Sequence, residues 1–508
     1  RGMAMRFVAW GVLMASTIAM PAFAGVRDYR VANEHRILGE FVDLLAIPNV
    51  AADTPNIRRN AEALMAMMER RGLAPRLLEG GDPKVPPVVY GEWKVPGAKK
   101  TIVLYAHYDG QPTVAAKWAA SPPWQPTLRT HAMEAGGTIL PMPVAGEKID
   151  PEWRLYARST SDDKLGVIAL LTAVDALKAE KRLPAMNVKI VFEGEEEAGS
   201  PHLGDILSRN KALLVSDGWV IFDGPAHQSG RRQVVFGVRG VTGMDLTVYG
   251  ARRPLHSGHY GNWSPNPAMM LSRLLASMKD DKGRVLVKGF YDDDAPVGAA
   301  ERAAIAAAPD SDKAVMSELG IAASEGGDGL LDSLMRTSLN VDGLMSADVG
   351  ANARNVIPAT AAATIDMRLA KGADDRKQVN KVIAHIAAQG FHVTEAEPTE
   401  AERARYPAIV RVNRREGGYN AVRTPMDAPI GRAIVSALGA LDGQPAVALP
   451  TSGGSLPLFM IEQNFGVPLI SVGSANYDNN QHAEDENVRI QNLWNAIETA
   501  AAIMTMKM

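Results

Sequence analysis

The chain has 508 residues, with 54 Lys and Arg against 57 Asp and Glu, and 46% of its residues are hydrophobic. This length exceeds one ordinary domain, and the apolar fraction is typical of globular rather than disordered proteins. A formal net charge of -3 argues against nucleic acid as a partner. The chain contains no cysteine, so disulfides, iron–sulfur clusters and thiolate zinc sites are excluded.

The N-terminal residues have the pattern of a secretory signal. Arg1 and Arg6 flank a short apolar run, residues 7–20, and the sequence Ala22-Phe23-Ala24 follows. We expect residues 1–24 to be a signal peptide cleaved after Ala24. A retained membrane anchor is the less favoured interpretation, because the run is too short to span a bilayer comfortably. The expected mature protein is soluble, secreted or periplasmic, with no membrane contact after cleavage.

Helices and strands alternate along the first half of the chain. The apolar pattern predicts helices at 28–46, 55–71 and 163–181, and strands at 88–90, 101–105, 188–192 and 219–222. Continuous apolar strands that alternate with helices are typical of a parallel or mixed sheet covered on both faces. The Gly- and Pro-rich segment 131–148 is predicted to be a surface loop.

The pattern changes after Gly240. Alternating strands at 244–249 and 361–369, helices at 267–278 and 374–389, and a strand at 391–394 predict a small β-α-β-β-α-β module with an insertion at 292–325. An α/β pattern resumes with a helix at 430–441 and a strand at 467–472. We therefore predict an α/β domain, 25–239 and 423–508, that is interrupted by a ferredoxin-like α+β module, 240–422.

Acidic and histidine side chains gather just after the predicted strands, where open α/β sheets bind ligands. Close-packed carboxylates need compensation by cations, and His with carboxylates suits zinc, with manganese or cobalt as alternatives. Asp217 competes with Asp223, which we favour because it directly follows its strand. The candidates are His107, Asp109, Asp162, residues 195–197, Asp223 and His482.

Seven short stretches resemble, in order, peptidase family M20 of co-catalytic zinc hydrolases, and especially its carnosinase-like dipeptidase branch. The resemblance implies a zinc-exopeptidase-like catalytic domain with an inserted lid that also dimerises. The family usually has Gly-Arg-Gly where this chain has 157–159 (ARS), and we expect this difference to alter the turn before Asp162. The matching stretches are 105–112 (YAHYDGQP), 161–164 (SDDK), 193–200 (EGEEEAGS), 255–258 (LHSG), 355–358 (NVIP), Arg368 and 453–455 (GGS).

The resemblance also implies roles for the residues of the metal cluster. One divalent ion, most simply zinc, would be held by His107, Asp162 and Asp223, and a second by Asp162, Glu197 and His482. Asp109 would orient the His107 imidazole. Glu196 would be the general base towards a metal-bound water.

Further roles follow from the resemblance for residues outside that cluster. His256 and Asn355 would reach the site from the partner subunit of a homodimer, where His256 would stabilise the oxyanion. Arg368 would bind the substrate carboxylate. Gly453, Gly454 and Ser455 would line the same pocket.

The expected function is hydrolysis of an amide bond next to a free carboxylate, in a dipeptide or at the C-terminus of a short peptide. An N-acyl-amino-acid deacylase is the nearest alternative, because the same metal pair and Arg368 would serve it. An exported binding protein without catalysis is the alternative from another class. The presence of Glu196 with every ligand position filled favours an enzyme.

Overall fold

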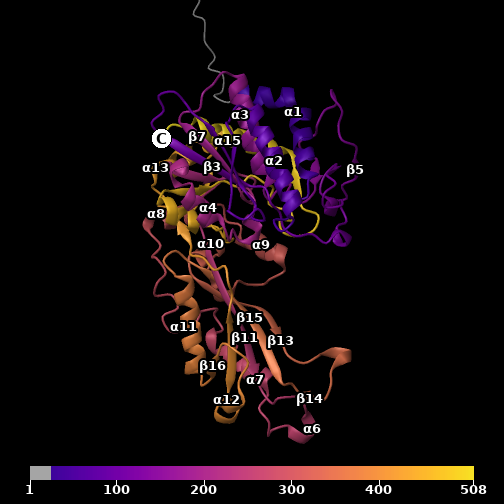
Figure 1. Ribbon diagram of the computed structural model, residues 1–508, viewed down its shortest axis with the longest axis vertical. Helices are drawn as coiled ribbons and strands as arrows, with labels where there is room; N and C mark the ends of the chain where they lie inside the picture. The colour runs from indigo at the N-terminus through magenta and orange to yellow at the C-terminus, as the bar shows by residue number, and fades with distance from the viewer. Residues whose placement is uncertain (1–23) are drawn as a thin grey trace, which may run out of the picture.

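A computed structural model describes residues 24–508 of the chain. The expected signal sequence, 1–24, lies outside the described residues apart from Ala24, the first residue of helix α1 (Ala24–Leu45). Figure 1 shows a broad upper part, which contains α1 and the C-terminus, and an elongated lower part formed by the middle of the chain. Each part has its own apolar core.

A mixed eight-stranded sheet forms the centre of the upper part. Its strands β7, β3, β8 and β20 run parallel to their neighbours in that group, so their carboxyl ends meet at one edge. Across the sheet, the order is β1 (Arg76–Leu78), β2 (Val88–Trp93), β7 (Asn187–Glu193), β3 (Thr101–His107), β8 (Gly218–Ile221), β20 (Leu469–Ser471), β9 (Gln233–Val235) and β19 (Val447–Leu449).

Helices cover both faces of this sheet. Ile102 and Leu104 of β3 belong to the core on one face, while Val103 and Tyr105 belong to the core on the other, as the alternation of side chains along a strand requires. The first face carries α1, α2 (Thr54–Arg70), α3 (Lys164–Ala179), α13 (Pro429–Asp442) and α15 (Ile490–Thr505). The second carries α4 (Leu203–Arg209), α5 (Lys211–Leu214) and α14 (Phe459–Phe465).

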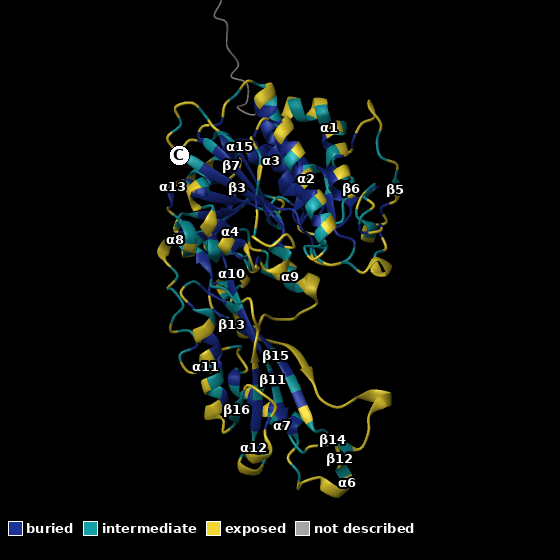
Figure 2. Cartoon of the chain, viewed as in Figure 1, coloured by how far each residue is buried: buried dark blue, intermediate teal, exposed yellow. Residues whose placement is uncertain are grey.

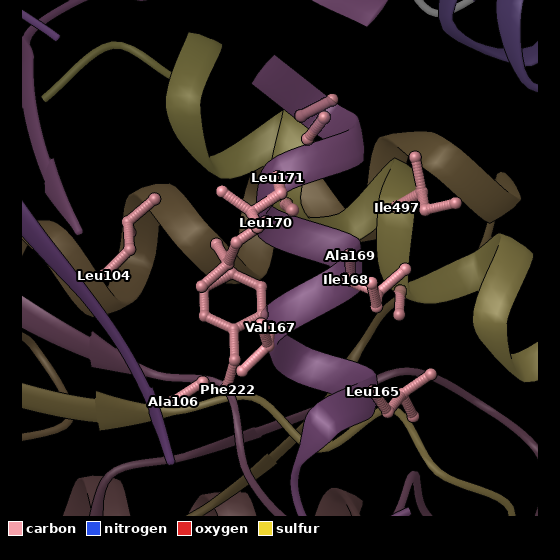
Figure 3. Close-up of a cluster of buried hydrophobic side chains, with 14 of the residues drawn as sticks. Leu104, Ala106, Leu165, Val167, Ile168, Ala169, Leu170, Leu171, Phe222 and Ile497 are labelled. Atoms are coloured by element: carbon pink, nitrogen blue, oxygen red, sulfur yellow. The ribbon is translucent and has the colours of Figure 1, made fainter. Parts of the chain in front are cut away.

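Helix α3 is buried along most of its length. Figure 3 shows its apolar side chains beside Leu104 and Ala106 of β3, Phe222 after β8, and Ile497 of α15. A side chain at Gly166 would collide with the carbonyl oxygen of Phe222, so glycine permits this close approach. The packing places the start of α3, and Asp162 just before it, beside the carboxyl ends of β3 and β8.

A smaller antiparallel sheet lies beside the upper part's core. Its order is β21 (Asn487–Arg489), β6 (Arg154–Tyr156), β4 (Thr127–Arg129) and β5 (Ile139–Leu140). Strand β5 falls inside 131–148, so the prediction of a simple surface loop there is wrong in part. Pairing with β4 orders this short stretch, although its side chains are not buried.

The lower part is a five-stranded sheet packed against two helices. Its elements follow the predicted β-α-β-β-α-β order, which confirms the predicted fold class of an α/β protein with an inserted α+β part. That order is β11 (Gly240–Tyr249), α7 (Pro267–Met278), β13 (Ser338–Met345), β15 (Thr360–Leu369), α11 (Asp375–Ala388) and β17 (Ile409–Arg414). We propose 240–422 as the bounds of this lid, because β10 (Gly237–Val238) and β18 (Val422–Arg423) pair at its base.

Two strands of the lid's five-stranded sheet have no counterpart among the predicted elements. β13 is exposed along most of its length and contains a bulge between Val341 and Gly343, so it lacks a clear alternation of apolar residues. β17 lies next to β11 and completes the module, while the predicted strand at 391–394 is β16 (His392–Thr394), a parallel edge strand. Helix α12 (Glu400–Arg405) joins β16 to β17.

The tip of the lid and the segment near its base complete the architecture. At the tip, β12 (Leu255–His256) pairs with β14 (Val356–Ile357) beside α6 (Ser257–Tyr260), and Figure 2 shows much of this region as exposed. The helices α8 (Ala299–Ala307), α9 (Asp312–Leu319) and α10 (Leu330–Leu334) lie between the two parts in Figure 1. Single 3-10 turns are η1 (Ala115–Lys117), η2 (Met133–Ala135), η3 (Glu196–Ala198), η4 (Glu325–Gly327) and η5 (Gly350–Asn352).

Within residues 24–508, none of the helices has the length and apolar character needed to cross a membrane.

Candidate active site

The predicted metal ligands meet at the carboxyl edge of the large sheet. His107 is the last residue of β3, Asp223 follows β8, and Glu197 lies in η3 just after β7. Asp162 precedes α3, and His482 comes from the loop after β20. Residues more than 300 positions apart in the chain thus lie together because parallel strands end at the same edge.

These side chains form two groups that share one carboxylate. The first consists of His107, Asp162 and Asp223, and the second of Asp162, Glu197 and His482. Within each group, one potential ligand atom per residue lies within 4.8 Å of the others. Asp162 Oδ1 lies 2.9 Å from His107 Nε2, and its Oδ2 lies 3.0 Å from His482 Nε2, so each oxygen faces a different group.

Asp217, the competing candidate for Asp223, lies away from this cluster. Its carboxylate accepts hydrogen bonds from the backbone N–H of Thr101 and from Lys100 Nζ, both at 2.9 Å. Thr101 begins β3 whereas His107 ends it, so Asp217 is at the opposite edge of the sheet. The geometry therefore favours Asp223 as the ligand.

The electrostatics of the cluster fit the binding of divalent cations. Burial and the negative charge of Asp162 raise the pKa of Glu197 to about 8 and that of Asp223 to about 6. Burial also opposes ionisation of Asp162, but hydrogen bonds from His107 and His482 outweigh it and lower the pKa of Asp162. Carboxylates so close together in a buried site repel one another unless cations neutralise them.

One atom supports this fit directly. Asp223 Oδ1 is buried and accepts no hydrogen bond from any residue in the described range 24–508. Because an unpaired buried oxygen is costly, its position is best explained by a ligand that binds it. The donors are imidazole nitrogens and carboxylate oxygens without thiolates, a set that suits zinc, manganese or cobalt.

Asp109 contacts more of the site than the sequence indicated. Its Oδ1 lies 3.2 Å from His107 Nδ1, in the position expected for orienting the imidazole. The two oxygens also accept hydrogen bonds from the backbone N–H groups of Glu196 and Glu197, at 3.1 and 3.0 Å. Asp109 therefore ties the turn that carries the proposed base to the strand that carries a ligand.

The three adjacent glutamates point in different directions. A Glu196 carboxylate oxygen lies 3.8 Å from His107 Nε2, inside the cluster, and burial raises the pKa of Glu196 well above its usual value. Glu195 instead turns towards α4, where it accepts the backbone N–H of His202 at 2.8 Å. Of these two, only Glu196 is placed to meet a substrate beside the metal ligands.

A cavity of about 560 Å³ opens beside the metal ligands. Arg368 of β15 reaches into it from the lid, where its Nη1 donates to Ser455 Oγ at 3.0 Å and its Nε to Asp366 at 3.1 Å. Gly453 and Gly454 line the cavity next to Ser455. The three predicted pocket residues and Arg368 are thus brought to the same cavity as Glu196.

His256 and Asn355 are not brought to this site. They lie at the exposed tip of the lid, where His256 ends β12 and Asn355 directly precedes β14, and Ser257 N–H donates to the Asn355 carbonyl at 3.0 Å. The His256 ring contacts the His259 ring, with centroids 4.4 Å apart. In Figure 1 this tip is at the end of the molecule opposite to the sheet of the upper part. Within one chain, these two residues contact neither the metal ligands nor the cavity.

Glu486 is a site residue that the sequence analysis missed. It is fully buried, and its two oxygens accept five hydrogen bonds at 2.8–3.0 Å. The donors are Arg158 Nη1, Ser161 Oγ and the backbone N–H groups of Ser159, Ser161 and Asp162. Glu486 therefore holds the turn that presents Asp162, and it lies four residues after His482 in the other metal loop.

This anchoring also explains how the turn forms without the usual glycines. Ser159 has a positive φ of 66°, a conformation that glycine adopts more readily. The backbone N–H of Ser159 donates a hydrogen bond to the Glu486 carboxylate, and Asn49 Nδ2 donates to the Ser159 hydroxyl at 2.9 Å. Buried hydrogen bonds thus stabilise a left-handed residue at this position.

We expect Glu486→Gln to weaken metal binding by about 10- to 100-fold, the usual effect of losing a partner behind a metal ligand. An amide would place an NH₂ group against N–H donors, and Asp162 would lose its fixed position. The measurement is competition for zinc between the metal-depleted protein and a chelating dye. The matched control is Glu40→Gln on helix α1, which disturbs the contact of Glu40 with Arg71 far from the metal ligands. Equal zinc affinity in both variants would contradict this role.

Comparison with known proteins agrees with this geometry and confirms the family resemblance. The model of peptidase family M20/M25/M40 matches residues 103–506. The chain is 24% identical over 479 residues to the Cys-Gly metallodipeptidase DUG1 of Candida albicans, which covers 90% of this chain and 91% of that protein. It is 30% identical over 259 residues to the human Beta-Ala-His dipeptidase, covering 50% of this chain and 45% of that protein.

A solved structure of a family member resembles this chain in both fold and sequence. The M20 family metallo-carboxypeptidase Sso-CP2 from Sulfolobus solfataricus superposes with a TM-score of 0.74 and 26% identity, covering 92% of this chain and 98% of that one. The match to the family model spans the lid and every proposed metal ligand. The chain is a metal-dependent hydrolase, and it belongs to peptidase family M20/M25/M40.

Proposed function

We propose that this protein is an exported dizinc dipeptidase, which hydrolyses the amide bond of dipeptides or releases the C-terminal residue of short peptides. The observation that carries the proposal is the shared carboxylate of Asp162, with Glu196 and Arg368 in the same cavity. The names of relatives support it, because they describe dipeptidases for Cys-Gly and Beta-Ala-His and a metallo-carboxypeptidase.

The two groups of ligands would hold one divalent cation each, most simply zinc. His107 and Asp223 would bind the first, Glu197 and His482 the second, and Asp162 both. When bound, the pair would lower the pKa of a water and polarise the scissile carbonyl.

The protein's own residues would perform the proton transfer and hold the substrate. Glu196 would accept a proton from the attacking water and deliver it to the leaving nitrogen. Arg368 would bind the free carboxylate of the substrate with its guanidinium, and Ser455 would hold that guanidinium in place. A dipeptide fits this arrangement because its carboxylate lies one residue from the scissile bond.

A direct comparison of substrates tests the proposal. The zinc-loaded full chain is given a mixture of dipeptides and, separately, a set of N-acyl amino acids. We expect cleavage of dipeptides, with little release of acyl groups. Preferential deacylation would favour the alternative that shares Arg368, while binding without cleavage of either set would favour a binding protein.

We further propose that the active protein is a homodimer in which His256 and Asn355 complete the partner's site. Their distance from the cavity within one chain supports this, because a role in the reaction requires a second chain to supply them. Exposed apolar residues on β13 and at the lid tip, Leu344, Met345 and Trp263, give the lid a surface suited to association.

Mixing two inactive variants tests this shared site. His256→Ala loses an oxyanion donor, which costs about 100- to 1,000-fold in kcat, and Glu196→Gln loses the base. In a mixed dimer, one of the two sites has both groups intact. At equal mixing, we expect activity to rise towards about a quarter of wild type, since about half of the dimers are mixed. Demonstrated subunit exchange without recovered activity would show that His256 does not act across a dimer.

Export is proposed from the N-terminal pattern alone. We expect the mature protein recovered from the producing cell to begin at Gly25. A retained N-terminus, shown by the intact mass, would contradict cleavage after Ala24.

A further inference from the structure

The cavity beside the metal ligands has one charged region and one apolar region. The charged side chains that line it are already used by the proposed reaction: Asp162, Glu196, Asp223, Arg368 and His482. The apolar region is formed by aliphatic side chains, which we call the apolar wall: Val235, Val238, Leu331, Leu334, Leu449 and Leu456.

The two parts of the molecule each contribute to the apolar wall. Val235 and Leu449 lie on β9 and β19 at the edge of the large sheet, and 3% and 6% of their surfaces are exposed. Leu331 of α10 packs against the small apolar cluster that these two residues form with Val447. Leu334, one turn further along α10, lies 3.3 Å from the position that a Cβ of Gly453 would take.

Helix α10 therefore joins the lid to the cavity. It lies between the upper part and the five-stranded sheet in Figure 1, together with α8. Ala308, which follows α8, packs on the same cluster of Val235 and Leu449 as Leu331 does. This packing fixes Leu331 and Leu334 as part of the cavity lining, although they lie more than 100 residues after the metal ligand Asp223.

The charge distribution determines which substrate side chain this wall can accept. Among the described residues that line the cavity, no cation or carboxylate lies on the apolar wall. Burying a charged side chain there would leave it without a partner, at a high cost in free energy. An aliphatic side chain would instead gain from removal of its surface from water.

We propose that Leu331 and Leu334 are specificity-determining residues, which select dipeptides with a neutral aliphatic side chain beside the scissile bond. The inference rests on the proposed peptidase function. The substrate carboxylate lies at Arg368, the amide lies beside the metal ligands, and one substrate side chain contacts the apolar wall. The helical segment 299–334 thus sets the side-chain preference of the enzyme.

The test compares kcat/KM for the zinc-loaded full chain on Gly-Gly and on two series, Xaa-Gly and Gly-Xaa, in which Xaa is Leu, Asp or Lys. In at least one series, we expect wild type to prefer Leu over Asp and Lys by about 10-fold or more. Leu331→Asn and Leu334→Asn should reduce that preference by about 10-fold, with hydrolysis of Gly-Gly by the same variant as the reference. The matched control is Leu330→Asn on the same helix, since Leu330 is 46% exposed and does not line the cavity.

The outcomes separate this inference from the proposed function. If wild type cleaves no dipeptide, the proposed function fails and the specificity assignment fails with it. If dipeptides are cleaved but Asp or Lys peptides match the Leu peptides in both series, only the specificity assignment is overturned. The specificity assignment is also overturned if Leu330→Asn reduces the preference for Leu peptides as much as Leu331→Asn does. The wild-type comparison decides the question even if a variant does not fold.

Discussion

Glu196→Gln is expected to lower kcat for dipeptide hydrolysis by about 100- to 10,000-fold, because the substitution keeps the size of the side chain but removes the general base. Glu196 is held in the cluster by the backbone contact of its N–H with Asp109, which the substitution leaves intact. Zinc content should therefore stay close to that of wild type. Steady-state kinetics together with metal analysis of the same sample measures both effects.

Glu195→Gln is the matched control for this variant. The two residues are adjacent and chemically identical, but Glu195 points to the N-terminus of α4 rather than into the cavity. We expect it to keep most of the activity. If Glu196→Gln remained active while Glu195→Gln did not, the assignment of the base would be wrong.

Asp162→Ala is expected to abolish activity and to impair both metal sites at once. Its two oxygens face His107 and His482 separately, so no other single ligand contributes to both groups. His482→Ala should instead impair mainly the group that it shares with Glu197. The number of zinc ions per chain, measured after dialysis against a weak chelator, distinguishes these cases.

Asp217→Ala serves as the control for the loss of a carboxylate next to strand β8. Asp217 lies at the opposite edge of the sheet, so this variant should retain its metal and its activity. Full zinc occupancy in Asp162→Ala would contradict the shared carboxylate.

The sequence predicted which acidic and histidine side chains gather at the edge of the sheet, because that signal is local. Each ligand follows an apolar strand or opens an apolar helix, as His107 does after 101–105 and Asp162 before 163–181. Parallel strands with buried faces must end at one edge, so the order of elements was enough to bring distant ligands together. The choice of Asp223 over Asp217 followed from the same rule, and the positions of both residues agree with it.

Features that depend on tertiary contacts could not be predicted in this way. Glu486 lies in a polar loop, and its function becomes visible only where the chain folds back on the turn at 158–162. Strand β13 is exposed and bulged, so pairing with β15 rather than apolar alternation defines it. Helix α15 has no counterpart among the predicted elements, although its packing against α3 completes the core. Leu331 lies after the insertion predicted at 292–325, in a stretch for which no element was predicted, and its packing on the cluster of β9 and β19 is visible only in the fold.

The most direct test of the proposed dizinc peptidase is a zinc titration of the metal-depleted full-length protein with dipeptide hydrolysis as the readout. We predict no hydrolysis without metal and a rise that reaches its maximum at two zinc ions per chain, because Asp162 joins two groups of ligands. Full activity at one zinc ion per chain, or dipeptide hydrolysis by the protein that retains no metal, would contradict it.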